Sequence, residues 1–291
     1  MGGSLYILRN KLGSFYNSFY WFDHFLAGRE NLIFEQRAID VQDKCVAIYV
    51  TFCEDDWDEW ELIMFGVLKA QNFEIVTVNN QKPWVQNSAA FKRKNRGFDL
   101  AAVRDVMEMF NGIPSEILVL NSSVAYNHGF SKMISQSRKI ASENPSDRII
   151  VGATDSMQSK HHMQSYFFFA RGNSVEVLMQ VYRKMKNWRF KRSAVFFGEI
   201  PILSKLKKMK IKCVALYPYD SLIRYALTQS SLRAETRKKI INNIPQNSTQ
   251  QLWRELFSFG APFVKRNLFN KNTGRVSGIP RNLKDALNHI S

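Results

Sequence analysis

Strand-like and helix-like segments alternate along residues 45–218, and this alternation constrains the fold more than any other feature of the chain. The run at 45–52 is apolar and rich in β-branched residues, which predicts a buried strand, and residues 73–79 predict a second one. Residues 57–70 between them have a helical pattern. A strand, a helix and a strand in this order form a βαβ unit with parallel strands. The sequence therefore predicts an α/β fold with a mainly parallel sheet.

The alternation continues to the end of this region. Strands are expected at 116–121, 148–153 and 212–218, and helices at 99–110, 129–142, 174–187 and 199–209. The aromatic segment 163–170 is the one candidate for an antiparallel strand. We therefore expect a mixed, mainly parallel sheet flanked by helices over residues 44–219, with helical extensions at 1–43 and 220–291.

The N-terminal extension has two interpretations. Its segment 5–27 is aromatic-rich, with four apolar side chains at helical spacing: Phe15, Phe19, Phe22 and Leu26. Trp and Tyr favour the boundary between membrane and water, which indicates an interfacial helix. A helix packed on the domain is the alternative, and Asp23 and His24 on this segment disfavour burial in a membrane.

The chain has 291 residues and a formal net charge of +16, which favours polyanionic partners. Residues 183–212 have eleven Lys and Arg with the single acid Glu199, and residues 220–291 have twelve with four acids. Such basic regions suit a phosphate-bearing substrate, an anionic membrane or nucleic acid. The chain has no helix-turn-helix, zinc-finger or RNP signature, so a nucleic-acid-binding protein is the weaker alternative.

The cysteines argue against a zinc site. Cys45, Cys53 and Cys213 form no C-x-x-C motif and no cluster with histidines. An odd number of cysteines without a disulfide framework indicates a reducing compartment.

Polar residues follow the predicted strands, where open parallel sheets bind ligands. Thr51 lies at the end of the first strand, Asn121, Ser122 and Ser123 end or follow the third, and Asp155 follows the fourth. We expect these residues to converge on one cleft. The turn at 121–123 has no carboxylate, the group that a divalent metal prefers.

The segment "KNRGFDLAAVR" predicts the start of a helix, with Asp99 as its N-cap. Asn95 and Gly97 shape the turn before it, and Arg96 is able to make a forked contact to phosphate. The segment is either a routine cap or an anion site at a helix N-terminus. It matches neither a Walker A loop nor G-x-G-x-x-G.

The segment "GATDSMQSKHHMQSYFFFARGN" combines an acid with two histidines. Asp155 is a candidate general base, and His161 or His162 is a candidate for binding substrate or stabilising a leaving group. Hydrogen bonding within a loop is the alternative for both histidines. Their spacing is not the i, i+4 spacing of a helical metal site.

Two further segments carry candidate residues. Glu199 lies in strongly basic surroundings, which keep a carboxylate ionised, or it complements the charge of a helix start. Lys265 and Arg266 follow a short helix and indicate either an anion contact or a solvated basic end.

Six motifs occur in one order: "VAIYVTF", "KNRGFDLAAVRDV", "ILVLNSSV", "GATDS…HHMQSYFF", "GEIPI" and "LWRELFSFGAPFVKR". This order resembles the rhamnan synthesis F family over about residues 44–270. The resemblance implies a Rossmann-like, GT-A-type glycosyltransferase whose nucleotide-sugar domain is residues 44–219. It implies transfer of a hexosyl or deoxyhexosyl unit to a lipid-linked polysaccharide of the O-antigen, lipopolysaccharide, capsule or rhamnan type. The enzyme would then be cytoplasmic and peripheral on the inner face of the bacterial inner membrane.

The resemblance also implies residue roles. The donor side consists of Thr51, Asn95, Arg96, Gly97, Asp99, Asn121, Ser122 and Ser123, and the acceptor or leaving-group side of His161, His162, Gln164, Ser165 and Lys265. Glu199 or Asp155 would deprotonate the acceptor hydroxyl. Ser122 stands where the family has Asp, which counts against a required Mg²⁺ or Mn²⁺. A catalytically inactive assembly partner is therefore a further alternative.

Overall fold

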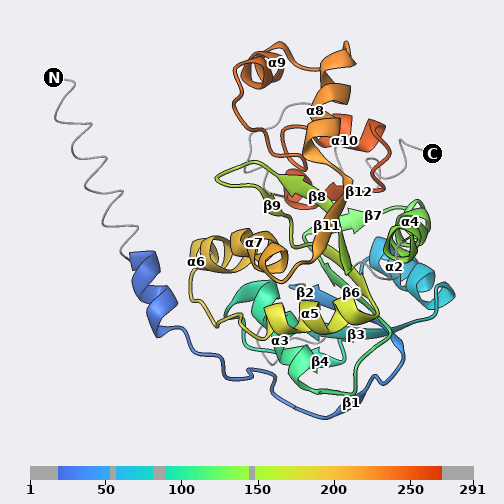
Figure 1. Cartoon of the computed structure of the whole chain (residues 1–291), viewed down its shortest axis with the longest axis vertical. Helices are drawn as coiled ribbons and strands as arrows, with labels where there is room; N and C mark the ends of the chain where they lie inside the picture. The colour runs from blue at the N-terminus through green and yellow to red at the C-terminus, as the bar shows by residue number, and fades with distance from the viewer. Residues whose placement is uncertain (1–18, 53–56, 81–88, 144–147, 271–291) are drawn as a thin grey trace.

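The computed structural model describes residues 19–52, 57–80, 89–143 and 148–270. Its centre is a sheet in the order β11-β8-β10-β6-β2-β3-β4, in which β10 alone is antiparallel to its neighbours (Figure 1). These strands are β2 (Cys45–Thr51), β3 (Phe73–Asn79), β4 (Phe91–Lys92), β6 (Glu116–Asn121), β8 (Ile149–Ser156), β10 (Phe167–Arg171) and β11 (Lys212–Tyr217). The predicted class, a mixed and mainly parallel α/β sheet, is confirmed.

Strand β2 lies between two parallel neighbours and is buried on both faces, which explains its almost continuous apolar sequence. Successive side chains of a strand point to opposite faces. Val46 and Ile48 accordingly join one core, and Ala47 and Tyr49 join the other.

Helices cover both faces of the sheet. The helices α3, α5 and α7 pack on one face, and α2 and α4 on the other. Their bounds are α2 (Glu59–Ala70), α3 (Phe98–Glu108), α4 (Phe130–Ser142), α5 (Asn173–Tyr182) and α7 (Ile200–Lys208). The three-layer arrangement is the one that a buried parallel sheet requires.

The aromatic segment departs from its predicted single strand. It forms a short strand β9 (His162–Met163) against β8, then a turn, and then β10. Strand β10 inserts between β6 and β8, and Phe167, Phe168 and Phe169 are fully buried there. The antiparallel direction expected for this segment is confirmed.

Helix α5 is shorter than predicted. It ends at Tyr182 instead of 187, because the carbonyl of Met185 accepts a hydrogen bond from Arg104 and the side chain of Asn187 binds two arginines. The predicted helix at 199–209 is preceded by two further turns: α6 (Lys191–Ser193) and the π-helical segment η1 (Ala194–Glu199).

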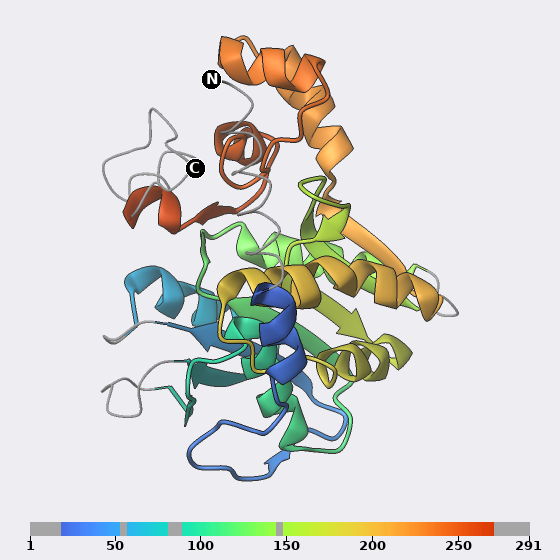
Figure 2. The ribbon, with the colours of Figure 1, turned by 90° about the vertical axis from the view of Figure 1, so that its left-hand side faces the viewer.

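The chain after residue 218 packs back against the core of the domain. It contains α8 (Tyr219–Thr228), α9 (Ala234–Ile241), α10 (Trp253–Ser258), β12 (Phe263–Lys265) and α11 (Asn267–Asn270). These helices lie at one end of the molecule, at the top of Figures 1 and 2. Strand β12 pairs with β7 (Val124–Tyr126), and Leu252 and Phe263 belong to the same core as β2. The hydrophobic core therefore does not end at residue 219.

Residues 19–26 are helical and pack on the segment that carries α6 and η1 (Figure 2). Phe15 lies outside the described residues. Among the described helices, none is long and apolar enough to cross a bilayer. A second small sheet joins β1 (Ile39–Asp40) to β5 (Phe110–Asn111).

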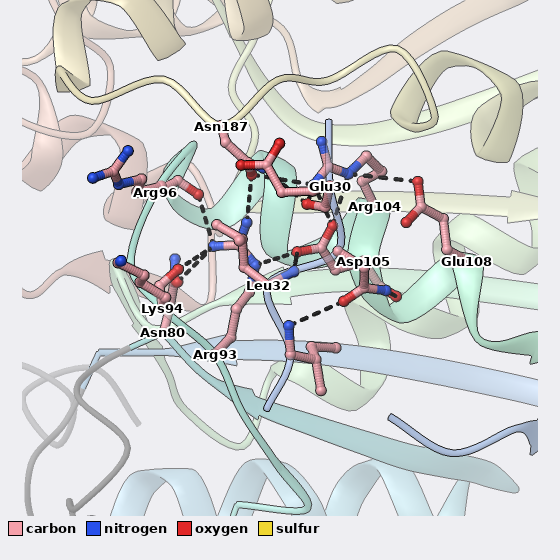
Figure 3. Close-up of polar contacts among 12 residues, drawn as sticks. Glu30, Leu32, Asn80, Arg93, Lys94, Arg96, Arg104, Asp105, Glu108 and Asn187 are labelled. Atoms are coloured by element: carbon pink, nitrogen blue, oxygen red, sulfur yellow. Dashed lines mark hydrogen bonds and ion pairs between the residues drawn. The ribbon is translucent and has the colours of Figure 1, made fainter. Parts of the chain in front are cut away.

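A buried ionic network links the N-terminal segment, α3 and the chain before α6 (Figure 3). The side chains of Arg93, Arg104 and Asp105 are fully buried. Asp105 accepts from Arg93 Nε at 2.6 Å and from Arg104 Nε at 2.7 Å. Its Oδ2 also accepts the backbone N–H of Leu32 at 3.0 Å.

Carbonyl oxygens satisfy the remaining donors of the two arginines. Arg104 donates to the carbonyls of Met185 and Glu30, each at 2.8 Å. Arg93 donates to the carbonyls of Lys94 at 2.8 Å and Arg96 at 2.7 Å. Two buried cations with one fully buried anion are tolerated because these dipoles replace the lost hydration and because the partly exposed Glu108 lies 3.6 Å from Arg104 Nε.

We expect Asp105→Asn to destabilise the fold strongly, because it leaves the buried guanidinium of Arg93 without a carboxylate and that of Arg104 with Glu108 at 3.6 Å. The loss in unfolding free energy should be about 3–5 kcal/mol, measured by urea denaturation. Glu235→Gln is the matched control, since Glu235 pairs with Lys239 at 2.6 Å while its side chain is 77% exposed. The control should change stability by less than about 1 kcal/mol. Similar losses in both variants would contradict this account.

Candidate functional site

A cavity of about 660 Å³ lies at the edge of the sheet where the parallel strands β2 and β6 end. Six parts of the chain line it: the end of β2, the start of α3 with the turn before it, the turn after β6, the turn before β10, the segment of α6 and η1, and the segment from β12. The lining residues are Phe52, Asn95, Phe98, Asp99, Leu100, Asn121, Ser122, Ser123, Gln164, Ser165, Tyr166, Lys191, Ala194, Val195, Glu199, Lys265, Arg266 and Asn267. This is the edge at which open parallel sheets bind ligands.

The turn after β6 is held by the side chain of Asn121. Its Oδ1 accepts from the backbone N–H of Ser123 at 3.0 Å and from the Ser123 hydroxyl at 2.5 Å. Its Nδ2 donates to Asp99 at 2.5 Å, which joins the turn to α3. Ser122 is buried, and its backbone N–H donates to Val50 at 2.9 Å. Ser123 is exposed and remains within reach of a ligand.

The turn before α3 requires a glycine at position 97. Gly97 has φ of +70°, and a Cβ there would meet the carbonyl of Lys186 at 2.3 Å. Its N–H donates to the carbonyl of Trp188 at 2.7 Å. Phe98 also has a positive φ, of 57°, which a bulky side chain adopts only when its surroundings impose it.

The predicted cap of this helix is wrong. The helix begins at Phe98 with Gly97 as N-cap, so Asp99 lies in its first turn. The carboxylate of Asp99 instead binds Asn121 across the cavity lining.

Two carboxyl groups meet in the cavity. The pKa of Asp99 is raised to about 6. The main cause is burial, which disfavours the charged form, and the second is the nearby negative charge of Glu199. Glu199 Oε1 accepts the backbone N–H of Ser165 at 2.9 Å, which orients that carboxylate. The π-helical segment η1 ends at Glu199, and such turns are frequent at functional sites.

Cations lie beside this carboxyl pair. Burial lowers the pKa of Lys265, which Glu199 and Asp99 partly offset. Lys191 is exposed, and its charge lowers the pKa of both Asp99 and Lys265. Arg266 donates to Asp58 at 2.9 Å and its guanidinium lies 5.2 Å from the ring centre of Trp60.

Nine of the predicted site residues line this cavity together: Asn95, Asp99, Asn121, Ser122, Ser123, Gln164, Ser165, Glu199 and Lys265. Gln164 is largely held by Thr154, whose hydroxyl donates to its Oε1 at 2.6 Å. The remaining six predicted residues are not in the lining.

The donor-side residues Thr51, Arg96 and Gly97 lie outside it. Thr51 is fully buried, and its carbonyl accepts the N–H of Asn80 at 2.9 Å. Arg96 lines a second cavity of about 380 Å³ beside residues 19–30. Gly97 shapes the turn through its backbone.

Asp155, His161 and His162 also lie outside it. Asp155 accepts the N–H of Tyr219 at 2.6 Å at the start of α8, and its other oxygen lies 2.7 Å from His161 Nε2. His162 Nδ1 lies 2.8 Å from the carbonyl of Lys160. Asp155 therefore anchors the C-terminal helices, because both its oxygens are engaged.

Sequence reasoning missed several lining residues. They are Phe52, Phe98, Tyr166, Lys191 and Asn267. Lys191 was one of eleven cations between residues 183 and 212, and nothing local distinguishes it from the others. The aromatic residues Phe52 and Tyr166 lie within the predicted strands 45–52 and 163–170, where apolar side chains usually belong to the core.

The donor set fits a divalent cation poorly. Mg²⁺ and Mn²⁺ prefer carboxylate and other oxygen ligands. The lining has the acids Asp99 and Glu199, but the charge of Lys265 interacts with both, and Ser122 offers a hydroxyl rather than a carboxylate. In the described part of the chain, no group of three or more His, Cys, Asp or Glu side chains is placed to hold a metal.

No family model matches the chain. The virulence protein VirA of Vibrio anguillarum is 23% identical to it over 204 residues. The match covers 62% of this chain and 62% of VirA. The resemblance to the rhamnan synthesis F family therefore stays a prediction.

Two solved glycosyltransferases show limited structural similarity. One is involved in glycosylation of the major capsid of PBCV-1, with 11% identity and a TM-score of 0.36 over 59% of this chain and 80% of that one. The other is GlyE of Streptococcus pneumoniae TIGR4, with 10% identity and a TM-score of 0.36 over 77% and 54%. Likeness at this level carries no functional argument, which rests instead on the geometry of the cavity.

We expect Asp99 to make the fold less stable as pH rises from about 4 to about 6. Its pKa is near 6 in the folded state and about 3.8 when unfolded, so the folded state holds the proton more tightly in this window. The effect should be roughly 2–3 kcal/mol. Urea denaturation at pH 4 and pH 7 should show that Asp99→Asn removes this loss. Glu176→Gln, an exposed change on α5, should retain it, and an unchanged pH dependence in Asp99→Asn would contradict the assignment.

Proposed function

We propose that this protein is a glycosyltransferase, which moves a sugar from a nucleotide-diphosphate donor to a hydroxyl group. One observation carries the proposal. The strand-end cavity contains the oriented carboxylate of Glu199 together with the cations Lys191 and Lys265. Its volume of about 660 Å³ lies within the range of small-molecule sites, about 300–1,000 Å³.

Glu199 acts as the general base in this proposal. The carboxylate takes the proton of the acceptor hydroxyl, whose oxygen then forms a bond to the anomeric carbon. The bond from that carbon to the diphosphate oxygen breaks, and its electron pair leaves with the phosphate. The N–H of Ser165 holds Glu199 Oε1 and leaves the other oxygen for the proton. Asp155 has no such role, because its carboxylate binds Tyr219 and His161.

Cations compensate the charge of the departing diphosphate. Lys191 and Lys265 line the cavity, and electrostatic stabilisation of a developing charge is commonly the largest catalytic contribution. Arg266 also lines the cavity, where its guanidinium is paired with Asp58. Asp99 is a half-buried carboxyl group whose pKa is raised to about 6, so near pH 6 about half of it is neutral and repels a phosphate less.

Neutral groups supply donor recognition. Asn95 and Ser123 are exposed polar residues of the lining, suited to hydrogen bonds with sugar or ribose hydroxyls. The rings of Phe52 and Phe98 offer apolar faces for a nucleotide base or a sugar ring.

The finer proposal concerns the acceptor. The order of six sequence motifs supports a GT-A-type enzyme that transfers a hexose or deoxyhexose to a lipid-linked cell-surface glycan. The excess of cations in 183–212 supports work at an anionic surface, such as the inner face of the inner membrane.

A panel of UDP- and dTDP-sugars, with and without Mn²⁺, should contain a donor that raises the melting temperature. Lys191→Ala and Lys265→Ala should each weaken the binding of that donor about ten-fold, because each removes a charge-assisted phosphate contact. Lys132→Ala, an exposed change on α4, is the control and should bind as the parent does. A panel with no stabilising donor would contradict the proposal.

Glu199→Gln should reduce transfer about 10²–10⁴-fold while leaving donor binding nearly unchanged, because it removes the base but keeps the shape. The assay measures nucleotide released in the presence of a lipid-linked acceptor. Glu143→Gln, at the exposed end of α4, is the control. If Asp155→Asn abolishes transfer and Glu199→Gln does not, the base is misassigned. Donor binding without any turnover would favour the inactive assembly partner.

A further inference from the structure

The helix at residues 19–26 presents an aromatic face to solvent. Trp21 and Phe22 are each 60% exposed, Phe25 is 82% exposed and Leu26 is 57% exposed. Phe196 of η1 is 55% exposed. Its ring contacts the ring of Phe197, which in turn contacts Trp21 of the helix. We call these five residues the aromatic face. Contiguous exposed apolar surface of this kind marks an interaction site.

The opposite side of the helix is fixed by polar contacts. Asp23 accepts the backbone N–H groups of Arg189 at 3.1 Å and Phe190 at 3.4 Å. The indole N–H of Trp188 donates to His24 at 3.1 Å, and the rings of His24 and Phe197 stack at 4.3 Å. The two residues that disfavoured a membrane helix in the sequence are therefore the residues that attach it to the protein.

Cations lie beside the helix that carries the aromatic face. Lys186 donates to the carbonyl of His24 at 2.8 Å, and the guanidinium of Arg192 lies 6.0 Å from the ring centre of Tyr20. The pKa of His24 is lowered, mainly by burial. The nearby charges of Lys205 and Arg29 lower it further. Asp23 and Glu30 are the acids on residues 19–30, and Asp23 is buried in the contacts above. The surroundings are therefore net positive.

We propose that the aromatic face is a docking surface for an anionic lipid bilayer. Aromatic and aliphatic side chains enter the boundary of headgroups and acyl chains, and the surrounding cations bind lipid phosphates. The combination of bulky apolar residues with nearby Lys and Arg selects this occupant, because a second copy of the chain would bring a second set of cations against the first.

The docking surface and the strand-end cavity share one segment. Phe190 packs on Phe19 of the helix, and the adjoining Lys191 lines the cavity. Phe196 belongs to the aromatic face, and its neighbour Val195 lines the cavity. Docking through this segment holds the cavity close to the lipid surface. The inference concerns the surface alone and does not depend on glycosyl transfer.

The test is sedimentation of the full chain with phosphatidylcholine vesicles, with and without phosphatidylglycerol. We expect binding only when phosphatidylglycerol is present, and weakening at high salt. Phe25→Asp should reduce vesicle binding about ten-fold or more. Ile241→Asp is the matched control, because Ile241 is 66% exposed at the end of the basic helix α9. The control should bind within about two-fold of the parent.

Contact is measured separately through fluorescence. Brominated lipids should quench tryptophan emission, and Trp21→Phe should remove most of that quenching while retaining an aromatic ring. Equal losses in Phe25→Asp and Ile241→Asp, or no vesicle binding, would overturn the proposal. A dimer in light scattering that Phe25→Asp dissociates, without vesicle binding, would assign the face to a second copy and also overturn it.

The same samples separate this inference from the proposed function. Phe25→Asp should retain the thermal shift with a nucleotide-sugar, because the aromatic face does not line the cavity. Vesicle binding without any donor shift would leave the docking surface standing and remove only the glycosyltransferase proposal.

Discussion

The buried network of Arg93, Arg104 and Asp105 is the constraint on which the rest of the structure depends. Water is absent around these charges, so each guanidinium N–H must find an oxygen in the fold. The four backbone carbonyls that serve come from three separate parts of the chain, at residue 30, residues 94 and 96, and residue 185. The network thereby fixes where the N-terminal segment crosses the sheet and where α5 must end.

The same network determines the shape of the cavity. Arg93 holds the two carbonyls before Gly97, and the chain then passes through two successive residues with positive φ. That unusual turn directs Asp99 toward Asn121 rather than into a cap. A strained backbone of this kind persists only where surrounding contacts over-determine it, and the buried charges supply those contacts.

Long-range pairing completes the site. The antiparallel strand β10 brings Ser165 to the edge where β2 and β6 end, and the pairing of β12 with β7 brings Lys265 there from near the C-terminus. Glu199 arrives from the π-helical turn before α7. The carboxylate of Glu199, the N–H of Ser165 and the cation of Lys265 thus come from segments up to 100 residues apart, which gives a charge arrangement that no local motif contains.

The sequence by itself determined the class of fold, because β-branched runs such as 45–51 are buried on both faces and leave no choice but a covered parallel sheet. It also indicated the strand-end edge and residues such as Asn121 and Glu199. Only the tertiary structure decided which polar groups face the cavity. Asp155 and Arg96 have the right chemistry for the site, but the carboxylate of one anchors α8 and the other lies beside a second cavity. The direction in which a polar side chain points, and the partner that it binds, depend on contacts between distant segments of the chain. A local pattern of residues does not contain those contacts.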